Sequence, residues 1–250
     1  MGARMDYYFR EYARGFSVSS RERILKVLDM VKDTPIERLL DIGCGDGSIS
    51  VLLKEVAQAK EVYGIELSPN GAKKASQKGV NVIVFDLEEL NKKRLPYPDS
   101  YFDLIFCGDI IEHIFEPSFL LKEIWRVLKK SGSCIVTTPN LASWYNRLFL
   151  LLGYQPYGTA CSLRFSSAGK AFSGIVASWG GKHIRVMTLK AFKDLIKAHG
   201  FRICELYGCC GIPPENTLKT RIVENIDRFI SKLSPALATW LIVKIRKNVS

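Results

Sequence analysis

The sequence predicts an α/β protein in which a mostly parallel sheet carries helices on both faces. Short apolar runs rich in β-branched residues alternate with amphipathic stretches of helical length, which is the pattern of such a sheet. The chain has 250 residues, of which 47% are hydrophobic and 24% charged, as in ordinary globular proteins and unlike disordered or collagen-like chains. We therefore expect residues 1–250 to form one domain.

The apolar runs that contain β-branched or aromatic residues are predicted as strands. In chain order they are Arg38–Ile42, Glu61–Ile65, Val80–Phe85, Phe102–Cys107, Cys134–Thr138 and Phe201–Leu206. The amphipathic stretches between them are predicted as helices, at Ser20–Lys32, Ser48–Glu55, Asn70–Lys78, Pro117–Leu128 and Thr188–Ala198. Glycines at positions 79, 132 and 200 follow helices whose last turns carry Lys or His, which is typical of helix C-termini.

Two regions depart from this alternation. Residues 141–182 are rich in aromatic residues, Gly and Ser, and an insertion of that length is typical of a lid or a substrate-binding segment, here expected to cover the acceptor site. Near the C-terminus a helical stretch at 217–231 precedes Ala236–Ile245, which fits either a helix or a strand by periodicity alone. The aromatic residues of the insertion would form an apolar pocket or simply pack onto the sheet: Trp144, Tyr145, Phe149, Tyr154, Tyr157, Phe165, Phe172 and Trp179.

The termini and the cysteines favour a cytoplasmic protein. The first residues carry scattered charges and no apolar run that could act as a signal peptide, and no stretch reaches the ~20 apolar residues of a membrane-spanning helix. The 7 cysteines include no C-x-x-C pair, which is typical of reduced thiols and disfavours a structural zinc site.

The most informative window is the glycine turn Gly43-Cys44-Gly45-Asp46-Gly47, which follows the first predicted strand and opens a helix. Such a turn lets a ligand approach the backbone and the helix N-terminus. A dinucleotide-binding fingerprint, G-x-G-x-x-G/A, needs Gly or Ala at its last position. That position is Ser48 when counted from Gly43 and Ser50 when counted from Gly45, so an NAD-dependent dehydrogenase is disfavoured. Asp41, just before the turn, would repel a pyrophosphate and attract a cationic ligand.

This window resembles motif I of the class I S-adenosylmethionine (SAM)-dependent methyltransferases, whose cofactor carries a sulfonium and an ammonium group. The resemblance implies a Rossmann-like sheet of seven strands in which the last strand, here the segment around LATWLIVKI, is antiparallel. It also implies that residues 1–250 are one methyltransferase domain. The chain resembles the branch that contains the ubiquinone-pathway O-methyltransferases, which corresponds to methyltransferase type 11 or type 23.

The same resemblance assigns the residues that bind the cofactor. Acids end successive predicted strands, and the carboxyl ends of parallel strands meet at one edge of the sheet, so these side chains should converge. Glu66 would hold the two ribose hydroxyls and Asp86 the adenine amino group. The full expected SAM-binding set is Asp41, Gly43, Cys44, Gly45, Glu66, Leu67, Asp86, Leu87, Cys107 and Asp109.

The acceptor side is expected to follow the fourth strand, in the window Asp109-Ile110-Ile111-Glu112-His113. An imidazole there can act as a general base near neutral pH, so His113 and Glu112 are the predicted catalytic residues. The window, together with His183, also resembles the metal-binding set of small-RNA 2′-O-methyltransferases. In that reading Asp109, Glu112, His113 and His183 would hold a divalent ion, although Asp109 replaces a Glu of that group. Whether a metal binds stays open at this point.

The expected function is transfer of a methyl group from SAM to an oxygen or carbon atom of a small-molecule acceptor. The alternatives are a metal-dependent RNA 2′-O-methyltransferase and a non-catalytic, cofactor-binding subunit. The 36 Lys and Arg against 25 Asp and Glu give a net charge of +11, which favours anionic partners. Because the expected cofactor edge is acidic, we place this charge on the outer surface, where it suits an anionic acceptor, a peripheral membrane contact or solubility. It does not by itself argue for nucleic acid.

Overall fold

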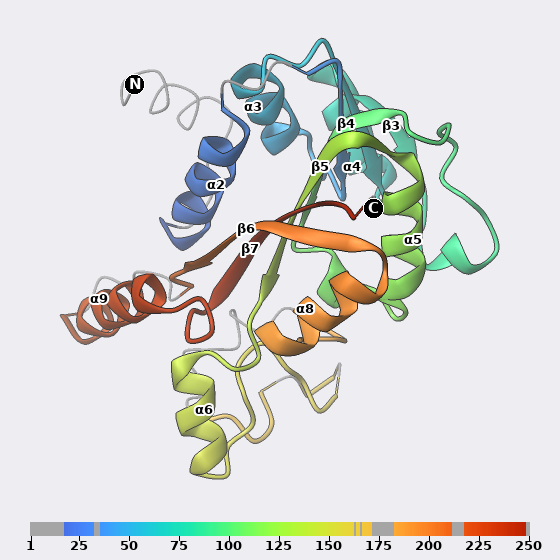
Figure 1. The fold of residues 1–250 in the computed structure, drawn as a ribbon. Coiled ribbons are helices and arrows are strands. Elements are labelled where there is room, and N and C mark those ends of the chain that lie inside the picture. The colour runs from blue at the N-terminus through green and yellow to red at the C-terminus, as the bar shows by residue number, and fades with distance from the viewer. Residues whose placement is uncertain are drawn as a thin grey trace.

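The computed structural model describes residues 18–32, 36–162, 164–165, 167–171, 183–211 and 218–248, with backbone alone for 18–21 and 218–220. A seven-stranded sheet in the order β3-β2-β1-β4-β5-β7-β6 forms the centre of the molecule (Figure 1). β7 runs antiparallel to both its neighbours, and the other pairs are parallel. The predicted Rossmann-like architecture with an antiparallel last strand is therefore confirmed.

Most strands lie where the apolar runs predict them. The observed bounds are β1 Arg38–Ile42, β2 Glu61–Glu66, β3 Asn81–Val84, β4 Phe102–Gly108, β5 Leu128–Pro139, β6 Phe201–Cys209 and β7 Trp240–Lys247. β5 begins at Leu128 instead of Cys134, because its pairing with β4 starts at Phe102 and resumes after a bulge. The polar sequence between Leu128 and Cys134 hides this extension from a periodicity argument.

The helices cover both faces of the sheet. Their bounds are α2 Val18–Val31, α3 Ser48–Val56, α4 Pro69–Gln77, α5 Pro117–Val127, α6 Trp144–Leu151, α8 Leu189–Ala198 and α9 Leu218–Leu233, with short 3₁₀ turns η1 Leu87–Asn91 and η2 Ile111–His113. One core cluster joins α2 and α3 to the sheet and a second joins α5 and α8 to its opposite face. In Figure 1 these two pairs of helices lie on either side of the strands.

The residue alternation explains why these helices pack as they do. On α5, Leu120, Leu121 and Ile124 are fully buried, at the i, i+1, i+4 spacing of one helical face. On α8, Phe192 and Ile196 are buried in the same way, and Thr188 caps the helix by accepting a hydrogen bond from the Ala191 amide. His199 is the C-cap of α8, in agreement with the helix end that the sequence predicts before Gly200.

The segment that follows β5 begins with an α-helix, α6, where the sequence showed only an irregular insertion. Its aromatic rings pack on one another: Phe149 and Tyr157 stand edge to face with ring centroids 5.1 Å apart, and Tyr145 and Tyr157 lie 5.9 Å apart. These contacts join rings of the insertion to one another, and they decide neither for an apolar pocket nor for packing onto the sheet. Phe172 and Trp179 lie outside the described residues, as does most of the second half of the expected lid. No described helix is long and apolar enough to cross a membrane.

Candidate active site

The glycine turn joins β1 to α3 at the carboxyl edge of the sheet. Gly43, Gly45 and Gly47 all have positive φ, at 78°, 56° and 77°. A Cβ at Gly47 would approach the Ala75 backbone to 2.8 Å, so this glycine lets α3 begin against α4. A Cβ at Gly45 would meet nothing within 4 Å, which leaves that part of the turn open to a ligand.

Glu66 ends β2 directly beside this turn. Its Oε2 accepts a hydrogen bond from the Gly45 amide at 2.8 Å, and its Oε1 accepts one from the Ser68 amide at 2.8 Å. The carboxylate is thus fixed in place while each oxygen keeps further lone pairs for other donors. Leu67, the next residue, is 62% exposed, so an apolar surface is available beside it.

Asp41 is buried at the end of β1, where its Oδ2 accepts a hydrogen bond from the Ser50 hydroxyl at 2.5 Å. Burial, with a smaller contribution from the neighbouring Glu66 charge, raises the pKa of Asp41 to about 7 against the lowering effect of the Ser50 hydrogen bond. Asp86 lies one strand further along and is exposed; its Oδ1 accepts from the Glu88 amide at 3.0 Å. The acids predicted at successive strand ends therefore stand at one edge of the sheet, since β1, β2 and β3 are adjacent and parallel.

The other predicted cofactor residues divide into surface and core positions. Leu87 is half-buried at the start of η1. The side chains of Cys44 and Cys107 are buried in the two core clusters, and Cys107 is fully inaccessible. Cys107 therefore presents no accessible surface at this edge.

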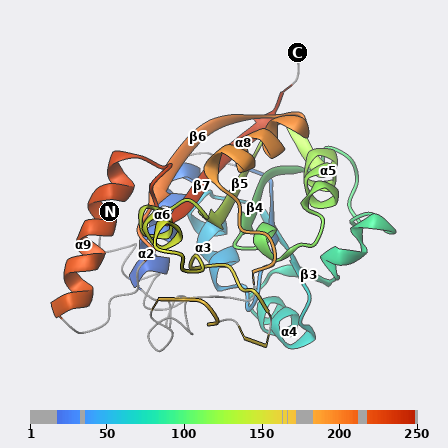
Figure 2. The same ribbon diagram turned by 90° about the horizontal axis from the view of Figure 1, so that it is seen from below.

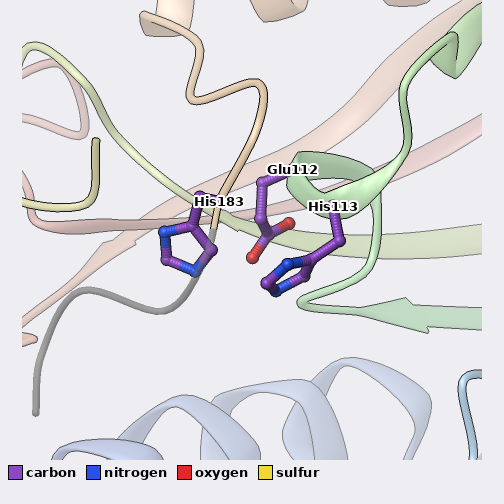
Figure 3. Close-up of side chains that lie close together, drawn as sticks. All are labelled: Glu112, His113 and His183. Carbon is purple, nitrogen blue, oxygen red and sulfur yellow. The ribbon is translucent and has the colours of Figure 1, made fainter. Parts of the chain in front are cut away.

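The predicted acceptor-side residues come together just beyond β4. Ligand atoms of Glu112, His113 and His183 all lie within 4.8 Å of one another, and the two imidazole rings are 4.8 Å apart between centroids. Figure 3 shows the Glu112 carboxyl group between the two rings, with η2 supplying Glu112 and His113 and a separate segment supplying His183. Residues 70 positions apart in sequence are thus held in one cluster.

Glu112 is fully buried at the centre of this cluster. Its Oε2 accepts a hydrogen bond from the Thr138 hydroxyl at 3.2 Å, whereas its Oε1 has no hydrogen-bond partner in the described part of the chain. Burial and, to a smaller extent, the nearby Asp109 charge raise the pKa of Glu112 to about 8. A buried carboxyl oxygen without a partner is costly, and such groups cluster at functional sites.

The His183 side of the cluster is anchored through the backbone. The Glu112 carbonyl accepts hydrogen bonds from the amides of Ile184 and Arg185, each at 2.9 Å. His183 Nδ1 lies 2.8 Å from the Gly158 carbonyl oxygen, and burial lowers the pKa of His183 below its usual value. The segment after the insertion is therefore tied both to η2 and to the insertion itself.

Asp109 does not join the cluster of Glu112, His113 and His183. Its carboxylate forms an ion pair with Arg23 of α2 and accepts a hydrogen bond from the Thr137 hydroxyl at 2.6 Å. Its φ of 57° places it in the left-handed region, a strained conformation of the kind that functional sites retain. Sequence reasoning missed Arg23, because the pair spans 86 residues and no local pattern marks it.

Asn140, which directly follows β5 at the same edge, has a structural role. Its amide nitrogen donates to the carbonyls of Ala236 and Ala238, at 3.2 and 2.9 Å, and its Oδ1 accepts from the Ala142 amide at 3.0 Å. With 2% of its surface exposed, this side chain fixes the start of the insertion against the approach to β7.

Comparisons with known proteins agree with this geometry. Residues 40–136 match the family model described as a methyltransferase domain. The chain is 31% identical over 134 residues to phosphoethanolamine N-methyltransferase 3 of Arabidopsis thaliana, covering 52% of this chain and 27% of that protein. It is 29% identical over 133 residues to a demethylmenaquinone methyltransferase of Listeria monocytogenes, covering 51% of this chain and 55% of that protein. The match thus spans about a quarter to about half of these relatives.

Solved structures share the fold over nearly the whole chain. A SAM-dependent methyltransferase of Thermotoga maritima has a TM-score of 0.58 at 22% identity, covering 98% of this chain and 100% of its own. A SAM-dependent methyltransferase of Archaeoglobus fulgidus has a TM-score of 0.56 at 20% identity, with 96% and 98% covered. Residues 40–136 therefore match a methyltransferase domain, and the chain has the fold of SAM-dependent methyltransferases of known structure.

Proposed function

We propose that this chain transfers a methyl group from SAM to an oxygen or carbon atom of a small-molecule acceptor. The observation that carries the proposal is the pair of sites at one sheet edge. The glycine turn with Glu66 lies at the ends of β1 and β2, and the cluster of Glu112, His113 and His183 lies beyond the end of the adjacent β4. One site suits the cofactor and the other suits the group that receives the methyl.

The residues at the first site fit SAM. The open space at Gly45 admits a ligand against the backbone, and the oriented Glu66 carboxylate can accept hydrogen bonds from two ribose hydroxyls. Asp86 and Leu87 would bind the adenine together with Leu67. Asp41 would supply negative charge toward the methionine side, where the ligand is cationic, whereas the charge of Asp109 is compensated by Arg23. When bound, SAM supplies an electrophilic methyl group on a sulfonium.

At the second site His113 is the candidate general base. It is not buried, and its ring stands next to the Glu112 carboxyl group and the His183 ring. For a hydroxyl acceptor, a ring nitrogen of His113 would take the proton that the oxygen loses as its bond to the methyl carbon forms. Glu112 and His183 would position the ring, because both are held by hydrogen bonds, to Thr138 and to the Gly158 carbonyl.

Residues 141–182 would form the cover of the acceptor site. His183 immediately follows this segment and contacts Gly158 within it, so the segment and the cluster are joined directly. The acceptor class is proposed by likeness to the relatives, which are named as methyltransferases of phosphoethanolamine and of demethylmenaquinone. Both are small molecules.

The second candidate is a metal-dependent RNA 2′-O-methyltransferase, which the cluster of Glu112, His113 and His183 favours as a ligand set. Asp109, the expected fourth ligand, instead pairs with the Arg23 guanidinium. A fixed positive charge beside the site opposes binding of a divalent cation. We therefore prefer the hypothesis that methyl transfer to a small molecule takes place without a metal ion.

The test is to screen a panel of small-molecule acceptors for turnover. Turnover is measured as the release of S-adenosylhomocysteine, with and without a chelator. For the acceptor so found, His113→Gln should lower kcat by about 10²–10⁴-fold while SAM affinity stays within about twofold, because general-base catalysis contributes that much. His199→Gln, at the end of α8, is the matched control and should keep full activity. Activity should survive the chelator.

Two results would overturn the preferred reading. If chelation abolished turnover and Mn²⁺ or Mg²⁺ restored it with an RNA 3′ end as acceptor, the metal-dependent alternative would hold. If SAM bound but His113→Gln left kcat unchanged with a hydroxyl acceptor, His113 would not be the base.

A further inference from the structure

Helix α9 presents its polar side to the protein and its apolar side outward. Asp227 and Ser231 are buried, at 0% and 3% exposure, and Glu224 and Arg228 are half-buried on the same face. A surface helix normally does the opposite and buries its apolar stripe. The outward face of α9 therefore calls for a physical explanation.

The orientation of α9 is fixed by a buried hydrogen-bond network around Asp227. Its Oδ1 accepts from the Trp144 indole at 2.8 Å and from the Thr239 hydroxyl at 2.9 Å, and its Oδ2 accepts from the Gly211 amide at 2.9 Å. Arg228 adds an ion pair to Glu22 of α2 at 2.9 Å. Rotating the helix to bury its apolar side would break these bonds and leave the Trp144 indole, the Thr239 hydroxyl and the Gly211 amide without this acceptor, which is unfavourable.

The outward face is a continuous apolar stripe. Ile222, Ile226, Phe229 and Leu233 are 52%, 42%, 64% and 66% exposed. Their spacing of 4, 3 and 4 residues places them within about 60° of one another around the helix axis. Single exposed apolar residues need no explanation, but an ordered stripe of this kind marks an interaction surface.

Helix α6 adds a second apolar element at the same end of the molecule. Leu148, Leu150, Leu151 and Leu152 are 47%, 54%, 83% and 60% exposed. The hydrogen bond from Trp144 to Asp227 joins the start of α6 to α9. Figure 1 shows the two helices beyond the layers that cover the sheet, and Figure 2 shows α9 standing apart at the left. Because α6 follows β5, this end is the carboxyl edge where the proposed acceptor site lies.

The charge around this surface is positive. Arg221 and Lys232 are exposed at one border of the α9 stripe, whereas the acids of the helix, Glu224 and Asp227, face the protein. Between Glu123 and Asp194 the sequence holds no Asp or Glu, and Arg147 of α6 and Arg164 of the insertion are exposed. The described part of this surface combines exposed aliphatic side chains with cations.

We propose that the outward faces of α9 and α6 dock on an anionic lipid bilayer. Apolar side chains bordered by Arg and Lys suit the boundary between acyl chains and headgroups, where cations meet lipid phosphates. A two-fold contact between copies of this face would bring its own cations together, which disfavours a second copy as the occupant. RNA would be bound through aromatic stacking, and the α9 stripe is mostly aliphatic. The inference does not depend on the proposed methyl transfer.

The experiment is sedimentation of the full chain with sucrose-loaded vesicles of phosphatidylcholine alone or with about 30% phosphatidylglycerol. We expect binding to the anionic vesicles that weakens as salt rises, and little binding to the neutral ones. The double variant Ile226→Ser with Phe229→Ser should reduce partitioning about tenfold or more, and Arg221→Glu with Lys232→Glu should reduce it on anionic vesicles. Phe119→Ser is the matched control, because Phe119 is an exposed aromatic residue on α5, away from this end.

SAM binding by calorimetry serves as the folding check, since Ile226 and Phe229 belong to no part of the proposed site. If the wild-type chain fails to bind anionic vesicles, or binds them equally well after the double change, the proposal is wrong. A wild-type dimer that the double change dissociates, without vesicle binding, would show that a second copy covers the face. If the wild-type chain bound RNA but not vesicles, and the double variant still bound RNA, the proposal would also be wrong.

Discussion

Individual acidic side chains at this sheet edge differ in their surroundings more than in their chemistry. Asp41 is buried and bonded to Ser50, Glu66 is held by two backbone amides, and Asp86 is exposed. The sequence identified these acids because they follow strands, but it could not show how they are bonded. Arg23 illustrates the limit: its pairing with Asp109 depends on how α2 packs, and nothing near either residue in the sequence predicts it.

The buried position of Asp41 predicts a pH-dependent stability. Because its folded pKa, about 7, lies above the usual value of 3.8, the folded state binds the proton more tightly than the unfolded chain does. This contribution is fully present below about pH 4 and is lost as pH rises through about 7. Relative to Asp41→Asn, the wild-type free energy of unfolding should therefore fall between pH 5 and pH 8.

Denaturant titrations of both proteins at several pH values check this, because other titrating groups cancel in the difference. Parallel curves for the wild type and Asp41→Asn would show that Asp41 does not have a raised pKa.

At the scale of elements, the sequence predicted the helices and strands whose buried residues recur at a regular spacing. β1 was predicted with its observed bounds, and α3, α5 and α8 within a residue, since strand and helix periodicities are set locally. α6 was missed because its run of leucines and aromatic residues is mostly exposed and has no amphipathic period facing the sheet. Ala236–Ile245 could not be assigned from periodicity, because β7 is central in the sheet and buried on both faces.

The start of α3 provides a prediction about the glycine turn. Gly47→Ala forces a Cβ to within 2.8 Å of the Ala75 backbone in addition to the strain of a positive φ, whereas Gly45→Ala carries the φ strain alone. We expect Gly45→Ala to cost about 1–2 kcal/mol of unfolding free energy and Gly47→Ala about 1–3 kcal/mol more.

Chemical denaturation of the two variants measures this difference directly. Equal losses would show that α3 and α4 can separate at no cost, and that the close approach at Gly47 is not a constraint.

For the whole molecule, the distribution of charge connects the fold to its proposed partners. The net charge of +11 coexists with acids at the ends of β1, β2 and β3, while α6, α9 and the acid-free stretch after Glu123 carry exposed cations. The sequence predicted this separation in outline. The surface that α9 presents could not be predicted, because its orientation depends on the hydrogen bonds of Asp227 to residues of α6 and of the segments before α9 and β7.

The most direct test of the account is isothermal titration of the chain with SAM and, separately, with NAD. SAM should bind and NAD should not. Glu66→Ala should weaken SAM binding by about 1.5–3 kcal/mol, because a charged hydrogen-bond acceptor is lost, while Glu61→Ala at the start of the same strand should leave it unchanged. Absence of SAM binding, a preference for NAD, or an unchanged affinity in Glu66→Ala would contradict the assignment of this edge as the cofactor site.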